Sequence, residues 1–202
     1  VSFASLDAVI VAVPAQAVRE VLTLIKPPKS IPLIIGAKGI EQQTAKFMNE
    51  VAAEAVPGAL TFVLSGPSFA RDVIKGLPTA VTLAAPTLAE AGEWAQAFSL
   101  PTFRVYGSDD VLGVEIGGAL KNVLAIACGI SDGKGLGDSA RAALTTRGFA
   151  ELMRFGKKLG AKPETLTGLA GLGDLLLTCS SRQSRNYSFG LAIGQGAPVS
   201  AA

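Results

Sequence analysis

The chain has 202 residues, of which 49% are hydrophobic and 17% are charged, and its formal net charge is +2. This composition supplies enough apolar side chains for a sizeable buried core and excludes a disordered chain. Charges of both signs are mixed along the sequence, so we expect neither a nucleic acid nor a membrane surface as a partner, whereas a small anionic ligand fits.

The first half of the chain alternates short apolar runs with segments of helical spacing. Strands of a parallel sheet are buried on both faces and are therefore continuously apolar. Strands that alternate with helices predict an α/β domain with a doubly wound parallel sheet. The expected strands are residues 8–13, 31–35, 60–64, 79–84 and 102–106, and the expected helices are residues 15–25, 44–56, 68–75 and 88–98.

The second half of the chain changes character after Tyr106. Strand-like runs stop there, and long helical patterns follow at residues 110–131 and 140–159. We therefore predict two domains: an α/β domain at residues 1–109 and a helical domain at residues 110–202.

Two glycine-rich stretches, residues 133–137 and 168–173, resemble phosphate-binding loops superficially. A dinucleotide-binding glycine loop must follow a strand and open a helix, and neither stretch follows a convincing strand. We therefore predict that both are turns between helices.

The cellular setting is suggested by the cysteines and by the apolar runs. Cys128 and Cys179 lie far apart and lack the spacing of metal ligands. They favour reduced thiols in a cytosol, with a single disulfide as the alternative, and we predict no metal site. The opening residues 1–10 lack the basic start of a signal peptide, and the longest apolar run, residues 116–130, is interrupted by Lys121. We expect a soluble cytoplasmic protein without a membrane segment.

Loops of small residues follow three of the predicted strands, and they contain Pro14, Lys38 and residues 65–68. In doubly wound sheets, ligands bind beyond the carboxyl ends of the strands. Ser68 precedes a predicted helix, so its hydroxyl could cap that helix or a ligand anion could meet the helix N-terminus. Capping is favoured for Ser68 alone, and a lone loop lysine such as Lys38 is usually solvated.

Lys121 and Asn122 interrupt an otherwise apolar helical run. A buried ammonium without a partner is strongly disfavoured, so Lys121 must reach solvent, pair with a carboxylate or lie beside a ligand. Gly117 and Gly118 lie one turn earlier on the same face, and we expect them to leave space beside the amine. The sequence contains no histidine, so proton transfer falls to Lys, Asp, Glu, Tyr or Cys, and this favours Lys121.

The last informative block is residues 171–186. Asp174 could cap a helix, or it could present its carboxylate to Lys121 across a cleft, with Thr178 on the same helical face. Residues 184–186 offer a hydroxyl, a guanidinium and an amide, which suit a phosphate or a carboxylate. As bare chemistry, a solvated turn is the favoured interpretation of that triplet.

Six motifs occur in a consistent order and together carry a family resemblance. They are AKGIE at 37–41, SGPSFA at 65–70, GLPTAV at 76–81, EIGGALKNVLAIACGI at 115–130, GLGDSARAALTTRG at 135–148 and GLGDLLLTCSS at 171–181. Over essentially its whole length the chain resembles the bacterial NAD(P)-dependent glycerol-3-phosphate dehydrogenases. The resemblance implies a partial Rossmann-type domain followed by an all-α substrate domain of the 6-phosphogluconate dehydrogenase-like type.

The resemblance also implies roles for individual residues. The proton-transferring lysine of the family corresponds to Lys121, and the catalytic group is completed by Asn122, Asp174 and Thr178. Substrate contacts are expected, besides Lys121 and Asp174, at Lys38, Gly66, Ser68, Ser184, Arg185 and Asn186. Cofactor contacts are expected at Pro14, Lys38, Ala70 and Arg185.

The implied activity is the interconversion of sn-glycerol 3-phosphate and dihydroxyacetone phosphate with NAD or NADP, NADPH being favoured by the resemblance. It would supply glycerol phosphate for phospholipid synthesis, with a homodimer as one expected assembly. Two alternatives stay open: a related reductase of ketopantoate or a hydroxyacid, and a non-catalytic binding module.

The chain departs from the family pattern in two respects. It lacks the GxGxxG unit and the closing helices of the family, so we expect a partial chain. Residues 187–188 are Tyr and Ser, where relatives often carry arginine, and the effect of this change on the phosphate or cofactor contact is left open.

Overall fold

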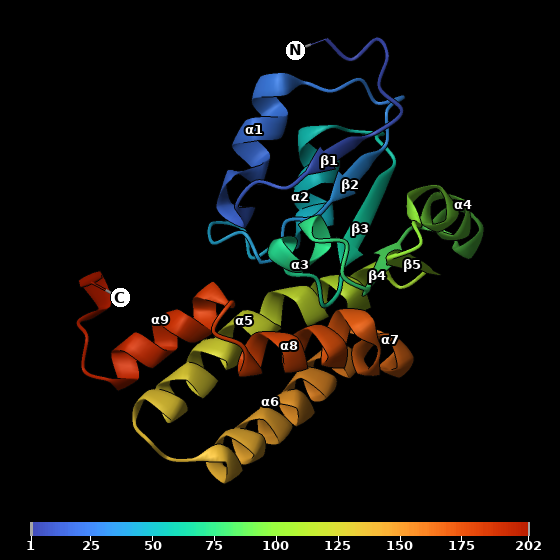
Figure 1. The fold of residues 1–202 in the computed structure, drawn as a ribbon. Helices are drawn as coiled ribbons and strands as arrows, with labels where there is room; N and C mark the ends of the chain where they lie inside the picture. The colour runs from blue at the N-terminus through green and yellow to red at the C-terminus, as the bar shows by residue number, and fades with distance from the viewer. Residues whose placement is uncertain (1, 202) are drawn as a thin grey trace.

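The computed structural model describes residues 2–201 of the chain. Figure 1 shows a sheet flanked by helices, with a second group of helices packed beneath it. The strands are β1 (Val9–Val11), β2 (Leu33–Ile35), β3 (Thr61–Ser65), β4 (Thr79–Ala84) and β5 (Phe103–Ser108). The helices of the sheet-bearing part are η1 (Ala15–Ala17), α1 (Val18–Ile25), α2 (Met48–Ala55), α3 (Ala70–Ile74) and α4 (Leu88–Phe98). The helical part contains α5 (Val111–Gly133), α6 (Asp138–Leu159), α7 (Pro163–Thr167), η2 (Leu169–Gly173), α8 (Asp174–Ser180), α9 (Arg185–Gly194) and η3 (Val199–Ala201).

The sheet has the strand order β1-β2-β3-β4-β5. The strands β1, β2 and β3 are parallel, as predicted, but β4 runs antiparallel to β3. The prediction of a parallel sheet is therefore wrong at this pair. The reason is the connection: α3 has only five residues, about 8 Å at 1.5 Å per residue. It is too short to carry the chain back along β3, as a parallel crossover requires.

Helices cover both faces of the sheet. On one face, Leu22 of α1 and Met48 of α2 pack against Leu33 of β2 in a fully buried cluster. On the other face, α4 packs on the strands, and its Trp94 ring lies 5.5 Å from the ring of Phe62. Apolar burial of this kind stabilises each layer. Because helices cover both faces of the sheet, a ligand can reach it only at the loops that follow the strands.

Most elements begin or end within a few residues of the prediction. The predicted helix 44–56 begins only at Met48, because Ala45 has φ 57° in the left-handed region. The predicted helix 15–25 opens with the 3-10 turn η1. Residues 168–173 do connect two helices, but most of this stretch is itself the π-helical turn η2.

The helix α5 runs through the middle of the helical part and packs against α6, α8 and α9. Its 23 residues are long and apolar enough to cross a membrane by length and composition alone, and half of that stretch is buried by the rest of the chain. The contact with α9 is close because Gly129 and Gly133 face Gly190 and Gly194. A Cβ at Gly129 would lie 2.1 Å from the carbonyl oxygen of Tyr187.

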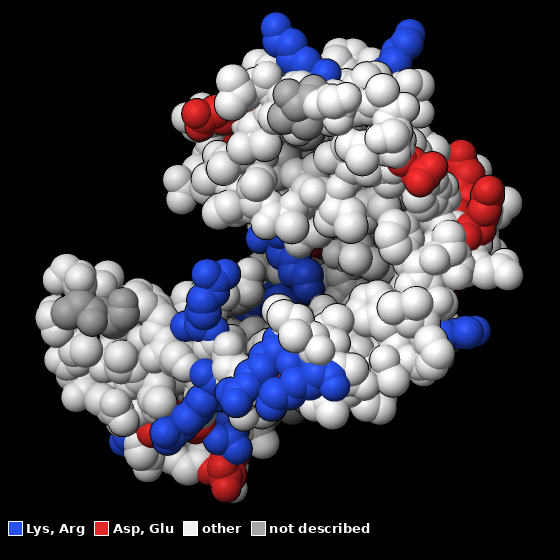
Figure 2. Space-filling model, turned by 45° about the horizontal axis from the view of Figure 1, so that its top comes forward, with Lys and Arg blue, Asp and Glu red and all other residues white. Residues whose placement is uncertain are grey.

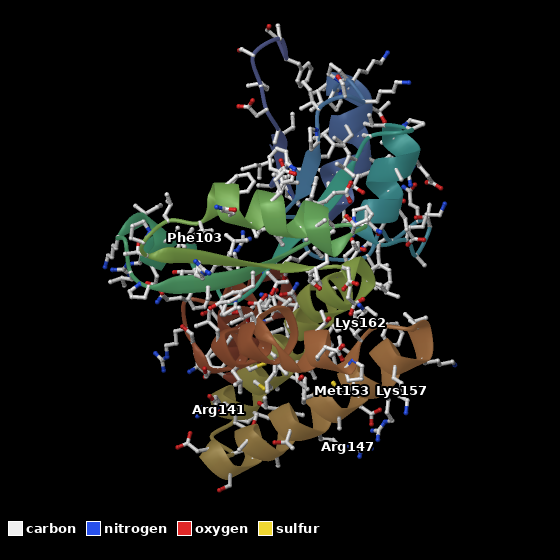
Figure 3. The ribbon with its side chains drawn as sticks, turned by 90° about the vertical axis from the view of Figure 1, so that its right-hand side faces the viewer. Phe103, Arg141, Arg147, Met153, Lys157 and Lys162 are labelled. Atoms are coloured by element: carbon white, nitrogen blue, oxygen red, sulfur yellow. The ribbon has the colours of Figure 1, made fainter. Side chains whose placement is uncertain are left out.

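The helix α6 lies on the outside of the helical part. Figure 3 shows Arg147 and Lys157 projecting from it into solvent. Its inner face buries Leu152, together with two glycines, against the neighbouring helices.

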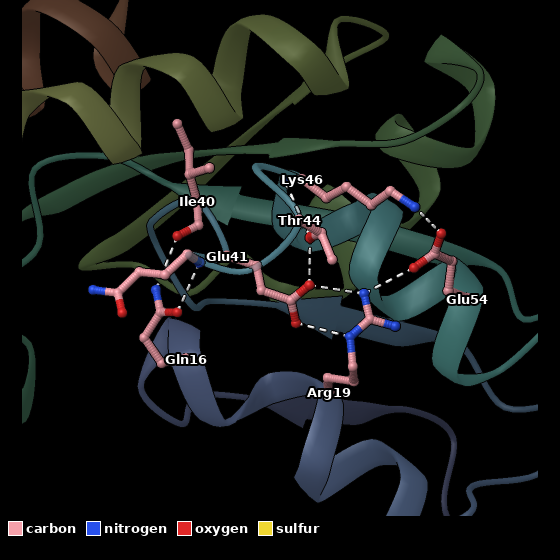
Figure 4. Close-up of polar contacts among 8 residues, drawn as sticks. Gln16, Arg19, Ile40, Glu41, Thr44, Lys46 and Glu54 are labelled. Carbon is pink, nitrogen blue, oxygen red and sulfur yellow. Dashed lines mark hydrogen bonds and ion pairs between the residues drawn. The ribbon is translucent and has the colours of Figure 1, made fainter.

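A network of charged side chains fastens the loop between β2 and α2 to helix α1 (Figure 4). The guanidinium of Arg19 donates two hydrogen bonds of 2.8 Å to Glu41 and one of 2.8 Å to Glu54. The hydrogen bonds from Arg19 lower the pKa of Glu41 to about 2. The amide of Gln16 donates to the carbonyl oxygen of Ile40 at 2.9 Å. Side chains of η1 and α1 thus hold the loop that follows the second strand.

Candidate active site

The loops after β1, β2 and β3 come together at one edge of the sheet, next to α5. Parallel strands bring their carboxyl ends to the same edge. Lys38 extends from the loop after β2, and its Nζ donates to the carbonyl oxygen of Gly66, after β3, at 3.3 Å. Pro14, after β1, lines a cavity together with Lys38 and with Lys121 of α5.

Asp174 of α8 lies between two lysines. Its Oδ1 accepts a hydrogen bond from Lys121 Nζ at 2.6 Å, and its Oδ2 accepts one from Lys38 Nζ at 2.6 Å. Lys121 Nζ also donates to Thr178 Oγ1 at 3.2 Å, and the Thr178 hydroxyl donates to the backbone carbonyl of Asp174 at 2.6 Å. Asp174 is 2% exposed and Lys121 is 8% exposed. A buried carboxylate therefore holds both ammonium groups in fixed positions.

The pKa of Lys121 is lowered to about 8, chiefly by burial and next by the nearby charge of Lys38, while Asp174 opposes the shift. These effects oppose one another, and burial, the largest of them, decides the sign of the shift. With a pKa of about 8, roughly a tenth of the Lys121 amine is unprotonated at pH 7. Such an amine can accept and return a proton near neutral pH.

The turn η2 determines where Asp174 lies. This π-helical turn packs against α5 and leads directly into α8, so Asp174 falls in the first turn of that helix. The close packing depends on Gly117, where a Cβ would lie 2.3 Å from the carbonyl oxygen of Ala170. π-Helical turns occur often at functional sites.

Gly118 makes room for a different neighbour. A Cβ there would lie 3.0 Å from Ser65 Oγ and 3.3 Å from Cγ of Lys38. The two glycines, Gly117 and Gly118, therefore admit η2 and the Lys38 stem to the surface of α5. The expectation that they leave space beside the Lys121 amine stays a prediction.

The N-terminus of α9 closes the other side of the site. Ser184 caps the helix, its Oγ accepting a hydrogen bond from the Tyr187 N–H at 3.2 Å. Asn186 Nδ2 donates to Asn122 Oδ1 on α5 at 2.9 Å. The exposed guanidinium of Arg185 adds a charge to a helix end that already favours anions.

Two cavities of about 580 and 490 Å³ flank Lys121 and Asn122. Figure 2 shows a hollow between the two parts of the molecule, with lysine and arginine side chains gathered in and below it. The charged residues that line the two cavities are Lys38, Arg71, Lys121 and Arg185. Because they are all cationic, the cleft suits a small anion.

Family models match nearly the whole chain. The model of the N-terminal part of NAD-dependent glycerol-3-phosphate dehydrogenase matches residues 2–91, and the model of its C-terminal part matches residues 110–202. The chain belongs to the NAD-dependent glycerol-3-phosphate dehydrogenase family.

Individual relatives agree with this membership. The chain is 61% identical over 199 residues to the glycerol-3-phosphate dehydrogenase (NAD(P)+) of a Bradyrhizobium strain, covering 96% of this chain and 60% of the relative. The crystal structure of the Coxiella burnetii glycerol-3-phosphate dehydrogenase superposes with a TM-score of 0.93 at 44% identity, covering 98% of this chain and 62% of that one. The yeast enzyme, from Saccharomyces cerevisiae, superposes with a TM-score of 0.84 at 26% identity, covering 96% and 59%. The chain thus spans about 60% of the length of the curated relatives it matches.

In this chain, the predicted site residues lie together. One cavity is lined by Pro14, Lys38, Lys121, Asn122, Arg185 and Asn186, and the other adds Ser68, Ala70, Thr178 and Ser184. Asp174 and the Gly66 carbonyl oxygen reach the site by accepting hydrogen bonds from Lys38. The roles assigned to these residues stay predictions.

The structure changes the interpretation of Ser68. Helix α3 begins after Phe69 and has no side-chain cap, so the favoured capping role for Ser68 is wrong. The exposed Ser68 hydroxyl instead donates to the carbonyl oxygen of Gly66 at 3.2 Å.

Tyr187, at one of the two positions where the sequence departs from the expected family pattern, does not line the cleft. It is 5% exposed, and its hydroxyl donates to Asp132 of α5, which also accepts a hydrogen bond from Arg141 of α6. Tyr187 therefore fastens α9 to the helical part and lines neither cavity beside Lys121.

Two residues of this region were missed by the sequence reasoning. Arg71 lines the second cavity, and its position three residues after Ser68 could have indicated it. Glu115 is buried on α5, and its Oε1 accepts a hydrogen bond from the Asn49 N–H at the start of α2 at 2.8 Å. Glu115 could have been noticed in the same way as Lys121, because it is also a charged residue in an apolar helical run and such residues are rarely buried without a partner.

Proposed function

We propose that the chain carries the catalytic cleft of a glycerol-3-phosphate dehydrogenase, which interconverts sn-glycerol 3-phosphate and dihydroxyacetone phosphate with NAD or NADP. The observation that carries this proposal is the buried Lys121, held by Asp174 beside a cationic cleft. The names of the relatives support the substrate and the cofactor. The product would supply glycerol phosphate for lipid synthesis.

The proton transfer is assigned to Lys121. Oxidation of a secondary alcohol requires a base for the hydroxyl proton, and reduction requires the same group to return it. Lys121 suits both directions because its pKa is lowered to about 8 by burial. Asp174 and Thr178 orient the amine through hydrogen bonds of 2.6 and 3.2 Å.

The substrate phosphate is assigned to the N-terminus of α9. Arg185 and Asn186 line both cavities beside Lys121, so a phosphate held there would leave the carbon chain of the substrate near the amine. Binding energy gained at the phosphate would position the reacting carbon. Lys38 and Ser68 would contact the rest of the substrate.

The strand-end loops fit a nicotinamide cofactor. Pro14 and Lys38 line one cavity and Ala70 lines the other, with Arg185 reaching both. A ligand lying along the carboxyl ends of β1 to β3 occupies the usual place for a dinucleotide in this architecture. When bound, the nicotinamide supplies the hydride acceptor.

The first test is a fluorescence titration of the chain with NADPH and NADH. It is followed by an absorbance assay of cofactor oxidation with dihydroxyacetone phosphate or ketopantoate. We expect oxidation that depends on dihydroxyacetone phosphate. Faster oxidation with ketopantoate would favour a related acid reductase, because Arg185 of α9 would then hold no phosphate. A folded chain that binds neither nucleotide would favour a non-catalytic module.

The remaining expectations are proposals of the same kind. We infer a division into residues 1–109 and 110–202, supported by the change from sheet to helices at that point. A cytoplasmic setting is supported by Cys128 and Cys179, which are both buried and free, as the sequence favoured. A homodimer stays a prediction from the family.

A further inference from the structure

A small cavity lies beside Lys38, at the end of β3 and against α5, and Lys121 does not line it. It is lined by Ala37, Lys38, Gly39, Val63, Ser65, Val114, Glu115 and Gly118. The cavity leaves about 10 Å³ for the centre of a water-sized sphere. That space admits one water molecule and is too small for a substrate, a cofactor or an organic ligand.

Two polar atoms without partners belong to residues of this cavity. Among residues 2–201, Ser65 Oγ and Glu115 Oε2 are the buried side-chain oxygens that make no hydrogen bond. Ser65 is 3% exposed and Glu115 is 6% exposed. Buried polar groups in folded proteins nearly always have a partner, and leaving one unsatisfied is strongly unfavourable.

We propose that this cavity binds one water molecule, which bridges Glu115 Oε2 and Ser65 Oγ. Two independent observations coincide in it: the unsatisfied oxygens of the described chain, and a space that matches one water. Residues 37–39 line the same cavity, and a buried water typically makes about three hydrogen bonds.

The protonation of Glu115 is consistent with a neutral ligand. Burial raises the pKa of Glu115 to about 8, so the carboxyl group is mostly protonated at neutral pH. Its hydroxyl donates to the water, which donates in turn to Ser65 Oγ. A metal cation in the same cavity would require a carboxylate, so it is disfavoured.

This water joins three elements behind the active lysines. Glu115 lies on α5, six residues before Lys121, and its other carboxyl oxygen accepts a hydrogen bond from the Asn49 N–H of α2. Ser65 ends β3 and precedes Gly66, whose carbonyl oxygen accepts from Lys38. The bridge therefore fixes the end of β3 against α5, which is the geometry that sets Lys38 beside Lys121.

The test is a pair of high-resolution crystal structures, of the chain and of its Ser65→Ala variant. We expect a single density peak at hydrogen-bond distance from both oxygens, about 2.6 to 3.2 Å, and its weakening or loss in the variant. A direct Glu115–Ser65 hydrogen bond without a peak, or an empty cavity, would overturn the proposal.

A solution measurement makes the test independent of crystal packing. Oxygen-17 magnetic relaxation counts water molecules with long residence times inside a protein. Ser65→Ala should lose one such water, whereas Ser180→Ala, whose exposed hydroxyl donates to a helix carbonyl, should lose none. An unchanged count in Ser65→Ala would contradict the proposal.

Discussion

The amine of Lys121 acquires its reactivity from where it is buried. A solvated lysine is almost fully protonated at neutral pH, whereas burial lowers the pKa of Lys121 to about 8. If Lys121 is the base, as proposed, the rate of glycerol phosphate oxidation should rise through about pH 8 and level off, because only the neutral amine accepts a proton. The reverse reduction should fall over the same range, because it needs the protonated amine. Initial rates in both directions between pH 6 and pH 10 check this, and flat profiles would contradict it.

Glu115 should make stability depend on pH. Its pKa is raised by burial from 4.5 to about 8, so the folded chain keeps a proton that the unfolded chain releases above about pH 4.5. This contribution to the free energy of unfolding falls as the pH rises from 4.5 to 8. The Glu115→Gln variant has no titrating group at this position, so its stability lacks this dependence on pH. Relative to the wild type, the variant should gain on the order of 1 to 3 kcal/mol between pH 5 and pH 8 in urea unfolding.

The control for this measurement is Glu93→Gln, on the exposed face of α4. Its unfolding free energy should follow that of the wild type across the pH range. If Glu115→Gln followed the wild type as closely, the buried carboxyl would be ionised in the folded chain over that whole range and the account of Glu115 would be wrong.

Among the elements, the pair α5 and α9 depends most on glycine. A Cβ at Gly190 would lie 2.1 Å from the carbonyl oxygen of Ile126, so Gly190→Ala must push the helices apart. We expect it to lower the free energy of unfolding by about 2 kcal/mol or more. Gly92→Ala in α4 meets nothing within 4 Å and should raise it by about 0.5 to 1 kcal/mol. Urea unfolding of both variants measures these changes in the free energy of unfolding. Equal changes in the two variants would contradict the close packing of α5 on α9.

An element could be predicted from the sequence when the residues that determine it lie within it or next to it. Residues 88–98 form a helix with the predicted bounds, and its determinants are local: the Thr87 side chain, directly before the helix, accepts a hydrogen bond from the Glu90 N–H. The direction of β4 could not be predicted from its own residues, because it depends on how far α3 carries the chain. The π-helical form of η2 was also hidden, since it depends on packing against Gly117 of α5.

In the whole molecule, the cleft between the two parts concentrates positive charge for an anionic substrate. Arg185→Met removes a cation from both cavities beside Lys121. We expect the KM for dihydroxyacetone phosphate to rise roughly 10- to 100-fold, because a charge-assisted hydrogen bond contributes about 1.5 to 3 kcal/mol. Activity with unphosphorylated dihydroxyacetone should change little. Steady-state kinetics with both substrates measure the change in KM for each.

Arg147→Met, on the outer face of α6 (Figure 3), serves as the control and should leave both KM values unchanged. Equal losses with the phosphorylated and the unphosphorylated substrate in Arg185→Met would show that Arg185 does not hold the phosphate.

The site was predictable as a set of residues but not as a geometry. The order of motifs indicated Lys38, Lys121 and Asp174, and the structure brings them together over 136 positions of sequence, from Lys38 to Asp174. No local pattern specifies that Asp174 bridges both amines, because this depends on how α8 packs on α5. The sign of the Lys121 pKa shift depended on the same packing.

The most direct test of the central claim is the turnover of dihydroxyacetone phosphate with NADPH by Lys121→Met, measured beside the wild type and Lys157→Met. Asp174 keeps its partner Lys38 in the variant, so the urea midpoint should shift only modestly. Loss of a general acid and base should lower turnover by roughly 10²- to 10⁴-fold, and Lys157→Met, exposed on α6, should match the wild type. Turnover by Lys121→Met at the wild-type rate would contradict the account.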